Sequence, residues 1–408
     1  MNLLLQKSKV KGNTAVKISG SKSETNRLLL LQALYPNIVL ENISNSDDSE
    51  VMIKALSDDV TIKDIHHAGT AMRFLTAFFA IQDEKEVVLN GSSRMKERPI
   101  KILVEALQQL DADISYDANE GFPPLRIRGR KITKNKISIK ADVSSQYISA
   151  LLLIAPKLEN GLELTLEGNI TSIPYIQMTL ALLNEIGVKT SFTGNTITVA
   201  HLKSVEPKNI TVESDWSSAS YFYSIIALSD IGTEIRLFSY KENSLQGDSA
   251  LAEIYSDFGV TTTFVGNFIL LRKASKCQLP NVSYNLNNSP DTAQTIAVTC
   301  FGLGIGCHLT GLHTLKIKET DRLEALKNEL AKLGANVSVT NDSLTLEPSS
   351  DIKENITIKT YQDHRMAMAF APLALRTDIV IEEAEVVSKS YPDFWNDLQN
   401  IGFQLSEI

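Results

Sequence analysis

The stretch Ser19-Gly20-Ser21-Lys22-Ser23-Glu24-Thr25-Asn26-Arg27 organises the interpretation of this chain, because it places two cations and several hydroxyls just before an apolar run. A helix that begins near Ser23 would present free backbone N–H groups and the positive end of its dipole to an anion, and Lys22 and Arg27 would add full charges. The stretch is not a P-loop, since Ser21 rather than glycine precedes Lys22 and Val16 stands where that motif needs its first glycine. It therefore predicts a phosphate or carboxylate site, with an ordinarily capped, solvated helix start as the alternative.

The composition limits the partners of such a site. The 408 residues carry a formal net charge of -8, so we expect no extended surface for nucleic acid or for an anionic membrane, and a local group of cations must attract any anion. The three cysteines form no CxxC pair, which indicates neither a disulfide framework nor a zinc site. No apolar run reaches about 18 residues, and Met1 to Lys11 shows no cleavage-site pattern. We therefore expect a soluble cytoplasmic protein of two or three domains.

One local event recurs along the chain: a polar, hydroxyl-rich turn is followed by an apolar helix. After the first helix, such starts recur at intervals of about 72 to 75 residues, near Thr70, Ser145, Ser217, Thr292 and Arg365. A second series keeps step with the first, at Pro99, Pro174, Asp248, Thr320 and Pro392. Most helices of the second series end in a glycine that is followed by a strand. We therefore expect six α/β units in two lobes of three, each lobe closed around a helical core, with a boundary near Val212-Glu213-Ser214.

Basic side chains recur at the starts of these helices and in the loops before the second helix of each unit. Because equivalent loops of a repeat fall on one face, we expect these side chains to converge on one anion site. The predicted cations are Lys22, Arg27, Arg94, Lys318, Arg322, Arg365 and Lys389. A solvated basic face is the alternative for each of them taken alone, but recurrence at equivalent positions favours function.

Carboxylates alternate with the cations near the C-terminal helix starts. Asp291 and Glu319 each open a helix in a cation-rich region, so they are candidates for proton transfer. Asp321 and Asp363 are better explained as structural ion-pair partners. The histidines show no ligand pattern with carboxylates or thiols, so we predict no metal.

Seven motifs of this chain resemble those of the EPSP synthase (3-phosphoshikimate 1-carboxyvinyltransferase) family, in the family's order and over nearly the whole length. They are Gly20-Ser21-Lys22-Ser23 with Asn26-Arg27, Ala68-Gly69-Thr70-Ala71-Met72-Arg73, Arg94 through Pro99, Ser144-Ser145-Gln146, Lys318-Glu319-Thr320-Asp321-Arg322, Asp363-His364-Arg365-Met366, and Lys389 through Asp393. The resemblance implies an α/β protein with a two-lobed inverse α/β barrel-like fold of six repeated βαβαββ units, three per lobe. It places the N-terminal lobe at residues 20–212 and the C-terminal lobe at residues 1–19 and 213–408, so that the first strand joins the C-terminal lobe.

The resemblance also implies an activity: transfer of the enolpyruvyl group of phosphoenolpyruvate to the 5-hydroxyl of shikimate 3-phosphate, with release of phosphate, on the path to chorismate. It implies no cofactor, and we expect a monomer. The residues implied for shikimate 3-phosphate are Lys22, Ser23, Arg27, Ser144, Ser145, Gln146, Ser172, Tyr175, Asp291 and Lys318. Those implied for phosphoenolpyruvate are Lys22, Gly69, Arg94, Gln146, Arg322, Arg365 and Lys389. Guanidinium forks suit its carboxylate and phosphate.

The mechanism that the resemblance implies is addition followed by elimination, without a covalent enzyme intermediate. Asp291 would be the base on the 5-hydroxyl, and Lys22 and Glu319 would share the acid and base roles at C3 and at the leaving phosphate, in a division that the sequence leaves open. The nearest alternative is UDP-N-acetylglucosamine enolpyruvyltransferase, which uses a loop cysteine in a Pro-Cys type motif that none of the three cysteines here has. A non-catalytic anion-binding relative is a further alternative, although Lys22, Asp291 and Glu319 are all present.

Overall fold

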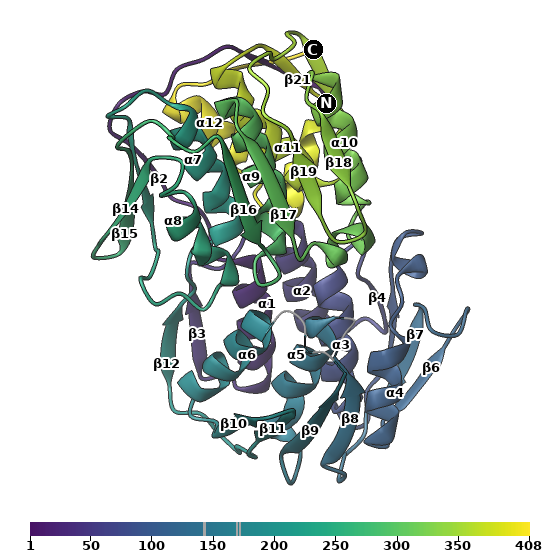
Figure 1. The fold of residues 1–408 in the computed structure, drawn as a ribbon. Coiled ribbons are helices and arrows are strands. Elements are labelled where there is room, and N and C mark those ends of the chain that lie inside the picture. Colours follow the sequence, from purple (N-terminus) through teal and green to yellow (C-terminus); the bar gives the residue numbers. More distant parts are fainter. Residues whose placement is uncertain (142–143, 169, 171–172) are drawn as a thin grey trace. The chain divides into compact units, whose positions relative to one another are not determined.

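The structure is a computed structural model, and it describes residues 1–141, 144–168, 170 and 173–408. The chain divides into two compact units (Figure 1). We call residues Gly20–Val212 the first unit, and residues Met1–Ser19 with Glu213–Ile408 the second unit. Each unit is described by itself below.

The first unit contains six α-helices in its described part, with two short 3-10 turns, η1 (Met95–Glu97) and η2 (Ala155–Lys157). The helices are α1 (Lys22–Leu34), α2 (Asp47–Ser57), α3 (Gly69–Ala80), α4 (Lys101–Gln109), α5 (Ser145–Ile154) and α6 (Ile173–Glu185). The strands are β3 (Ile38–Glu41), β4 (Ile62–Asp64), β5 (Glu86–Asn90), β6 (Asp113–Tyr116), β7 (Leu125–Arg128), β8 (Lys136–Lys140), β9 (Leu162–Glu167), β10 (Thr190–Thr193), β11 (Thr196–Val199) and β12 (Lys208–Thr211).

The second unit repeats this plan. Its helices are α7 (Trp216–Leu228), α8 (Leu251–Ile254), α9 (Ala293–Leu303), α10 (Arg322–Lys332), α11 (His364–Phe370) and α12 (Phe394–Ile401). Its 3-10 turns are η3 (Gly247–Ala250), η4 (Pro290–Thr292), η5 (His313–Ile317), η6 (Ala371–Leu375) and η7 (Ala384–Lys389). Its strands are β1 (Leu3–Gln6), β2 (Thr14–Val16), β13 (Glu234–Phe238), β14 (Val260–Val265), β15 (Phe268–Lys273), β16 (Asn281–Asn285), β17 (Gly306–Thr310), β18 (Val337–Val339), β19 (Leu344–Leu346), β20 (Ile356–Ile358), β21 (Ile379–Ile381) and β22 (Gln404–Glu407).

Five sheets in the described chain share one four-stranded topology. Their orders are β4-β5-β7-β6, β10-β11-β9-β8, β14-β15-β13-β2, β16-β17-β19-β18 and β20-β21-β1-β22. In each, one outer strand pairs in parallel with its neighbour, as β4 does with β5, and the other two pairings are antiparallel. A sixth sheet consists of the parallel pair β12 and β3. This recurrence confirms the expected βαβαββ repeat, with one unit reduced to two strands.

The N-terminal strands complete two repeats of the second unit. Strand β1 lies between β21 and β22, where Leu4 pairs with Val380 on one side and with Ser406 on the other. Strand β2 pairs in parallel with β13. Both ladders join N-terminal strands to strands of the second unit.

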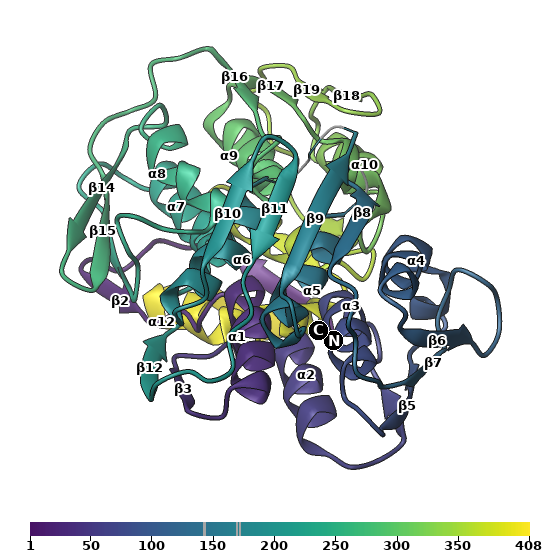
Figure 2. The ribbon, with the colours of Figure 1, turned by 90° about the horizontal axis from the view of Figure 1, so that it is seen from below.

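The first helix of each repeat forms the core of its unit. Helices α3, α5, α7, α9 and α11 are buried almost all round, as expected for helices that sheets and other helices cover on every side. Helix α3 packs against α5, and α9 packs against both α7 and α11. Figure 2 shows the sheet β10-β11-β9-β8 in front of α5 and α6. In three of these buried helices the only partly exposed side chain is polar and lies in the first turn: Thr70, Gln146 and Ser217.

The predicted helix starts and ends are confirmed. Helices begin within two residues of every position in the first series, and α1 begins at Lys22 with Ser21 as its N-cap. Glycines with positive φ end the second helices, as predicted, at Gly187, Gly259, Gly334 and Gly402. Gly20 is required for a different reason, because a β carbon there would lie 1.9 Å from the carbonyl oxygen of Asn42.

Candidate active site

Asp291 lies at the centre of three cations in the second unit. The turn η4 presents it immediately before α9. Its Oδ1 accepts a hydrogen bond from Arg322 Nη1 at 2.9 Å and lies 3.5 Å from Lys318 Nζ, and its Oδ2 accepts from Arg365 Nη2 at 3.1 Å. The Asp291 side chain is only 13% exposed. The structure thus brings three of the predicted cations together around the carboxylate of Asp291, itself a predicted site residue.

Arg322 binds two further carboxylates. Its Nη2 donates to Glu319 Oε2 at 2.7 Å, and its Nε donates to Asp363 Oδ2 at 2.6 Å. The guanidinium is buried, which alone would lower its pKa, but the carboxylates of Asp363, Glu319 and Asp291 outweigh burial and raise the pKa. The ion pair with Arg322 is the structural role expected of Asp363, which also caps α11, where its Oδ1 accepts from Arg365 N at 2.8 Å.

The charges around Asp291 decide what its carboxylate can do. Burial acts to raise its pKa, but Arg365, Lys318 and Arg322 together lower it further, so that the pKa of Asp291 is held well below its usual range. Asp291 is therefore a fixed counter-ion, and it is a weak base as long as these three cations face it.

Another buried carboxylate, that of Asp248, is linked to Arg365 through Ser217. Arg365 Nη2 donates to Ser217 Oγ at 3.3 Å, and Ser217 in turn donates a short hydrogen bond to Asp248 Oδ2. Asp248 is 4% exposed, and its Oδ1 has no hydrogen-bond partner in the described part of the chain. Burial, with Asp291 as the next cause, raises the pKa of Asp248 to about 6. The first turns of α7 and α11 thus hold a carboxylate that gains its charge close to neutral pH.

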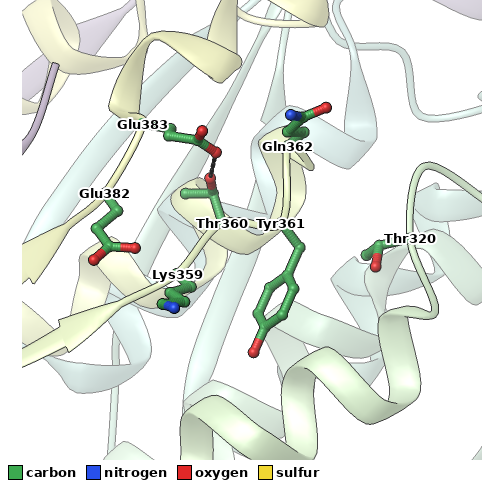
Figure 3. Close-up of a pocket in the computed structure, with 7 residues that line it drawn as sticks. All are labelled: Thr320, Lys359, Thr360, Tyr361, Gln362, Glu382 and Glu383. Atoms are coloured by element: carbon green, nitrogen blue, oxygen red, sulfur yellow. Dashed lines mark hydrogen bonds between the residues drawn. The ribbon is translucent and has the colours of Figure 1, made fainter. Parts of the chain in front are cut away.

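Lys389 contacts Gln362, one of the residues that line a cavity of about 440 Å³ in the second unit. Its Nζ donates to the carbonyl oxygen of Gln362 at 2.8 Å. Gln362 lines the cavity, as Figure 3 shows, together with Thr320, Lys359, Thr360, Tyr361, Glu382 and Glu383. Gln362 directly precedes Asp363, and Thr320 directly follows Glu319. The cavity therefore adjoins, along the chain, two of the carboxylates that face Arg322.

In the first unit, Lys22 is paired with a buried carboxylate. Its Nζ lies 3.8 Å from Asp48 Oδ2, and the side chain of Asp48 is 9% exposed. A buried hydroxyl chain holds the start of α2, which carries Asp48, against α1, which carries Lys22: Ser46 donates to Ser49, and Ser49 donates to Asn26 Oδ1 at 3.0 Å. This network fixes the first turns of both helices.

Arg27 is more buried than its predicted role would require. Its Nε donates to Thr179 Oγ1 at 2.8 Å, its Nη2 donates to Ser149 Oγ at 2.9 Å, and its Nη1 donates to the carbonyl oxygen of Ser23 at 2.7 Å. The guanidinium also lies over the rings of Phe74 and Tyr175. Burial lowers the pKa of Arg27 to about 10. The structure therefore gives Arg27 protein partners at all three nitrogens.

The predicted phosphate residues Ser144 and Ser145 stand at the start of α5. Ser144 is the N-cap, and its Oγ accepts from Gln146 N at 3.3 Å. Gln146 Nε2 donates to Thr70 Oγ1 at 3.2 Å, which joins the starts of α5 and α3. Ser172, also predicted to bind phosphate, lies outside the described residues.

The start of α3 carries Gly69, and the loop before α4 carries the predicted Arg94. Arg94 is 61% exposed and pairs with Glu97 at 2.8 Å. A β carbon at Gly69 would lie 2.4 Å from Nη1 of Arg98. Sequence reasoning did not single out Arg98, Asp48 or Asp248. Arg98 lies in the motif Arg94 through Pro99 and Asp248 marks the second series of the repeat, so the sequence held a signal for these two and none for Asp48.

The charged groups described above lie at helix starts within α/β repeats, where cations cluster beside buried carboxylates. Such sites define a class of protein that binds small anions and can move protons beside them. None of the helices in the described ranges is long and apolar enough to cross a membrane. Comparison with known proteins identifies the family of the chain. It belongs to the EPSP synthase (3-phosphoshikimate 1-carboxyvinyltransferase) family, whose pattern it matches over residues 57–398.

Similar proteins support this assignment. A protein of Bacteroides fragilis (strain YCH46) named 3-phosphoshikimate 1-carboxyvinyltransferase is 47% identical over 392 residues, which cover 95% of each chain. A protein of Haemophilus influenzae (strain ATCC 51907 / DSM 11121 / KW20 / Rd) with the same name is 36% identical over 425 residues and covers 95% of this chain and 96% of its own.

Solved structures show the same fold. The EPSP synthase of Acinetobacter baumannii has a TM-score of 0.81 at 20% identity, with both chains covered completely. The enolpyruvyl transferase NikO of Streptomyces tendae has a TM-score of 0.73 at 14% identity, with 99% of this chain and 98% of that chain covered. At these identities the likeness concerns the fold alone.

Proposed function

We propose that this chain transfers the enolpyruvyl group of phosphoenolpyruvate to the 5-hydroxyl of shikimate 3-phosphate and releases inorganic phosphate. Family membership over most of the chain supports the reaction. The observation that carries the chemistry is the cluster in which Asp291 faces Arg322, Arg365 and Lys318 beside Glu319. It offers two guanidinium forks for an anion that has both a carboxylate and a phosphate, and it holds carboxylates that can move protons.

The reaction balances as an addition followed by an elimination. In the addition, C3 of phosphoenolpyruvate gains a proton, the 5-hydroxyl oxygen bonds to C2, and the hydroxyl proton passes to a base. In the elimination, C3 loses a proton and the bond from C2 to the phosphate oxygen breaks. No electron is gained or lost, so the scheme needs no cofactor, and none of its residues comes from a second chain.

Asp291 is the base on the 5-hydroxyl in this scheme. The charges around it determine when its carboxylate is basic enough to accept the proton. While Arg365, Lys318 and Arg322 face it, the pKa of Asp291 is well below its usual range. When the substrate's carboxylate and phosphate take up Arg322 and Arg365, the hold of these cations on Asp291 weakens and its basicity rises. Substrate binding thus converts a counter-ion into a base. Lys318 then stays near the ring hydroxyls.

Lys22 and Glu319 share the remaining proton transfers, at C3 and at the leaving phosphate. Glu319 hydrogen-bonds to Arg322, which brings a carboxylate to the guanidinium that would hold phosphoenolpyruvate. Lys22 is a cation at the start of α1, where a developing phosphate charge is stabilised both by the ammonium and by the helix dipole. Arg94, Gly69, Gln146 and Lys389 complete the phosphoenolpyruvate contacts.

Shikimate 3-phosphate is held chiefly by the first unit. Ser144, Ser145 and Ser172 bind its phosphate, and the start of α5, which Ser144 caps, adds the positive end of a helix dipole. The rest of the proposed shikimate 3-phosphate site is lined by Lys22, Ser23, Gln146 and Tyr175. Arg27 binds the carboxylate only by exchanging one of its present partners, because Thr179, Ser149 and the Ser23 carbonyl already accept from its three nitrogens.

Phosphate release tests this function. Purified protein is incubated with phosphoenolpyruvate alone, with shikimate 3-phosphate alone and with both, and inorganic phosphate and the enolpyruvyl product are measured. We expect phosphate and product in equal amounts, and only when both substrates are present. Arg365→Gln should abolish this release, whereas Arg272→Gln, which changes a 57% exposed arginine of the same unit, should not. Wild-type protein that forms no product, or that releases phosphate without the acceptor, contradicts the proposal.

A further inference from the structure

Asp248 is a buried carboxylate for which the local fold shows no structural role. It is the second residue of η3 and is 4% exposed. Within the described residues its only hydrogen bond is the short one from Ser217 to Oδ2, so its side chain caps neither η3 nor α8, and Oδ1 has no partner. Burial of a carboxylate oxygen without a hydrogen bond is costly, and such costs are retained chiefly at functional sites. Asp248 is therefore a candidate for a function.

The place of Asp248 beside α7 is fixed by the nearby side chain of Gln246, which is buried. The Nε2 of Gln246 donates to the carbonyl oxygen of Ser214 at 2.9 Å, and its Oε1 accepts from Trp216 N at 2.9 Å. Ser214 and Trp216 flank the N-cap of α7. The turn that carries Asp248 is thus bound to the start of the helix that carries Ser217.

The hydroxyl of Ser217 links Asp248 to Arg365. A serine hydroxyl has one proton and two lone pairs. Because the proton of Ser217 is directed to Asp248, a lone pair is left to accept from Arg365 Nη2 at 3.3 Å. In the described ranges the other partner of this guanidinium is Asp291, through its Oδ2 at 3.1 Å and its carbonyl oxygen at 3.3 Å, and the Nε–H of Arg365 has no acceptor. Once an anion displaces the Asp291 carboxylate, Ser217 is the side chain that still orients the guanidinium.

The charge of Asp248 acts on the same guanidinium. Within the described chain, the charged groups that face Asp248 are Asp291 from η4, Arg365 from α11 and Asp215 from the N-cap of α7. Burial, and next the charge of Asp291, raise the pKa of Asp248 to about 6, although Arg365 and the hydrogen bond from Ser217 act to lower it. An ionised carboxylate at this place attracts Arg365 and repels any anion bound to it, whereas the protonated form does neither.

We propose that Asp248 is a positioning residue for phosphoenolpyruvate: through Ser217 it orients the guanidinium of Arg365, and its own negative charge weakens the hold of that guanidinium on an anion. The inference rests on the function proposed above and adds control by pH to the same site. Protonation of Asp248 then tightens the binding of phosphoenolpyruvate. By reciprocity, the binding of phosphoenolpyruvate favours the protonation of Asp248.

Asp248→Asn tests the charge, because it keeps the shape of the side chain and an acceptor for Ser217 but cannot ionise. KM for phosphoenolpyruvate is measured for wild type and variant at pH 5 and at pH 8. The phosphate of the substrate also titrates near pH 6, so the quantity compared is the ratio of the two KM values at each pH. We expect a ratio within about twofold of one at pH 5, and a wild-type KM about 3- to 10-fold above that of the variant at pH 8. Asp230→Asn, at an 89% exposed carboxylate of the same unit, is the control and should show one ratio at both pH values.

Asp248→Ala and Ser217→Ala test the orientation of Arg365. At pH 5, where the charge of Asp248 is largely absent in wild type as well, each variant should raise KM for phosphoenolpyruvate by about 5- to 20-fold, while KM for shikimate 3-phosphate changes less than about twofold. The double variant should be no worse than the poorer single variant, because both changes remove the same link. Ser224→Ala removes a fully buried hydroxyl farther along α7, which accepts from Thr299 at 2.8 Å, and as the control it should match the wild-type KM.

Two results would overturn the inference. A ratio of wild type to Asp248→Asn that is the same at both pH values rules out the effect of the charge. Alanine variants whose fold increases multiply in the double variant, or that raise both KM values equally, rule out the positioning of Arg365 through Ser217. Asp248→Asn remains a complete test of the charge if Asp248→Ala fails to fold, because it preserves the size of the side chain.

The proposed function can fail separately. Wild-type protein without turnover contradicts that function, and the ratios of wild type to Asp248→Asn are then measured as Kd values for phosphoenolpyruvate by calorimetry at the same two pH values. We expect the same change of the ratio with pH. A ratio that does not change, or wild-type protein that binds no phosphoenolpyruvate, overturns the inference.

Discussion

Asp291 shows how one residue can serve two purposes in turn. Its carboxylate pairs with Arg322, Arg365 and Lys318, three cations that would otherwise repel one another. An anionic substrate has to compete with Asp291 for the same guanidinium groups. In the proposed mechanism, the residue that balances these cations therefore also weakens substrate binding, and it acts as a base once the substrate displaces it.

Asp291→Asn should separate these two effects. We expect kcat to fall by about 10² to 10⁴-fold because the base is lost, while phosphoenolpyruvate binds the free protein several-fold more tightly because its competitor is gone. Steady-state kinetics give the first quantity and calorimetry gives the second. Asp230→Asn, at an 89% exposed carboxylate of the same unit, is the control for both. Weaker binding by Asp291→Asn contradicts the competition.

Asp248 makes stability depend on pH in an unusual direction. Its pKa is raised to about 6, whereas an unfolded aspartate titrates near 4, so between these values the folded state holds a proton that the unfolded state has lost. The contribution of Asp248 to the free energy of unfolding therefore falls as pH rises through this window, and it stays lower above it.

Asp248→Asn cannot ionise and should escape this loss. Relative to wild type, we expect the variant to gain about 1 to 3 kcal/mol in the free energy of unfolding between pH 4.5 and pH 7.5. Urea unfolding at the two pH values measures the difference, with Asp230→Asn as the exposed control. An equal difference from wild type at both pH values shows that Asp248 does not carry the shift.

Some of these residue-level features could be predicted and others could not. Recurrence at equivalent repeat positions indicated Asp291, Arg322 and Arg365 as members of one charged group. The pairing of Arg322 with Asp363, 41 residues away, and the contact of Arg98 with Gly69 depend on the folded distances between separate elements. Local sequence carries no signal for such contacts.

At the scale of elements, aspartates at two helix starts have very different surroundings. Asp321 caps α10 by accepting from Leu323 N and Glu324 N, each at 3.2 Å, and its side chain is 34% exposed. Asp363 caps α11 and also holds the buried guanidinium of Arg322. Removal of the first loses a cap, whereas removal of the second also leaves a buried charge short of a partner.

Asp363→Ala should therefore cost about 3 to 5 kcal/mol of unfolding free energy, and Asp321→Ala about 1 kcal/mol. Urea unfolding of the two variants beside wild type gives both numbers. Similar losses for the two variants would mean that Glu319 and Asp291 suffice to balance Arg322, so that Asp363 acts only as a cap.

The starts and ends of elements were the most predictable part of the fold, because capping residues and glycines act locally. Gly187, Gly259, Gly334 and Gly402 all have the positive φ that a helix end needs. The place of β1 between β21 and β22 is a pairing of residues hundreds of positions apart, so it could be inferred only through the family resemblance.

For the whole molecule, the central claim is the choice of acceptor. The proposed phosphate contacts of Ser144, Ser145 and Ser172 favour a small phosphorylated acceptor over a sugar nucleotide. Cys300 and Cys307 are buried in the core of the second unit, and Cys277 lies outside any Pro-Cys type motif, so the loop thiol of the sugar-nucleotide enzymes has no counterpart here.

The most direct measurement is phosphate release from phosphoenolpyruvate with either acceptor, shikimate 3-phosphate or UDP-N-acetylglucosamine, under identical conditions and with the product identified by mass spectrometry. We predict turnover with shikimate 3-phosphate and formation of its 5-enolpyruvyl ether, with no release above background from the sugar nucleotide. Turnover with UDP-N-acetylglucosamine alone would contradict the account.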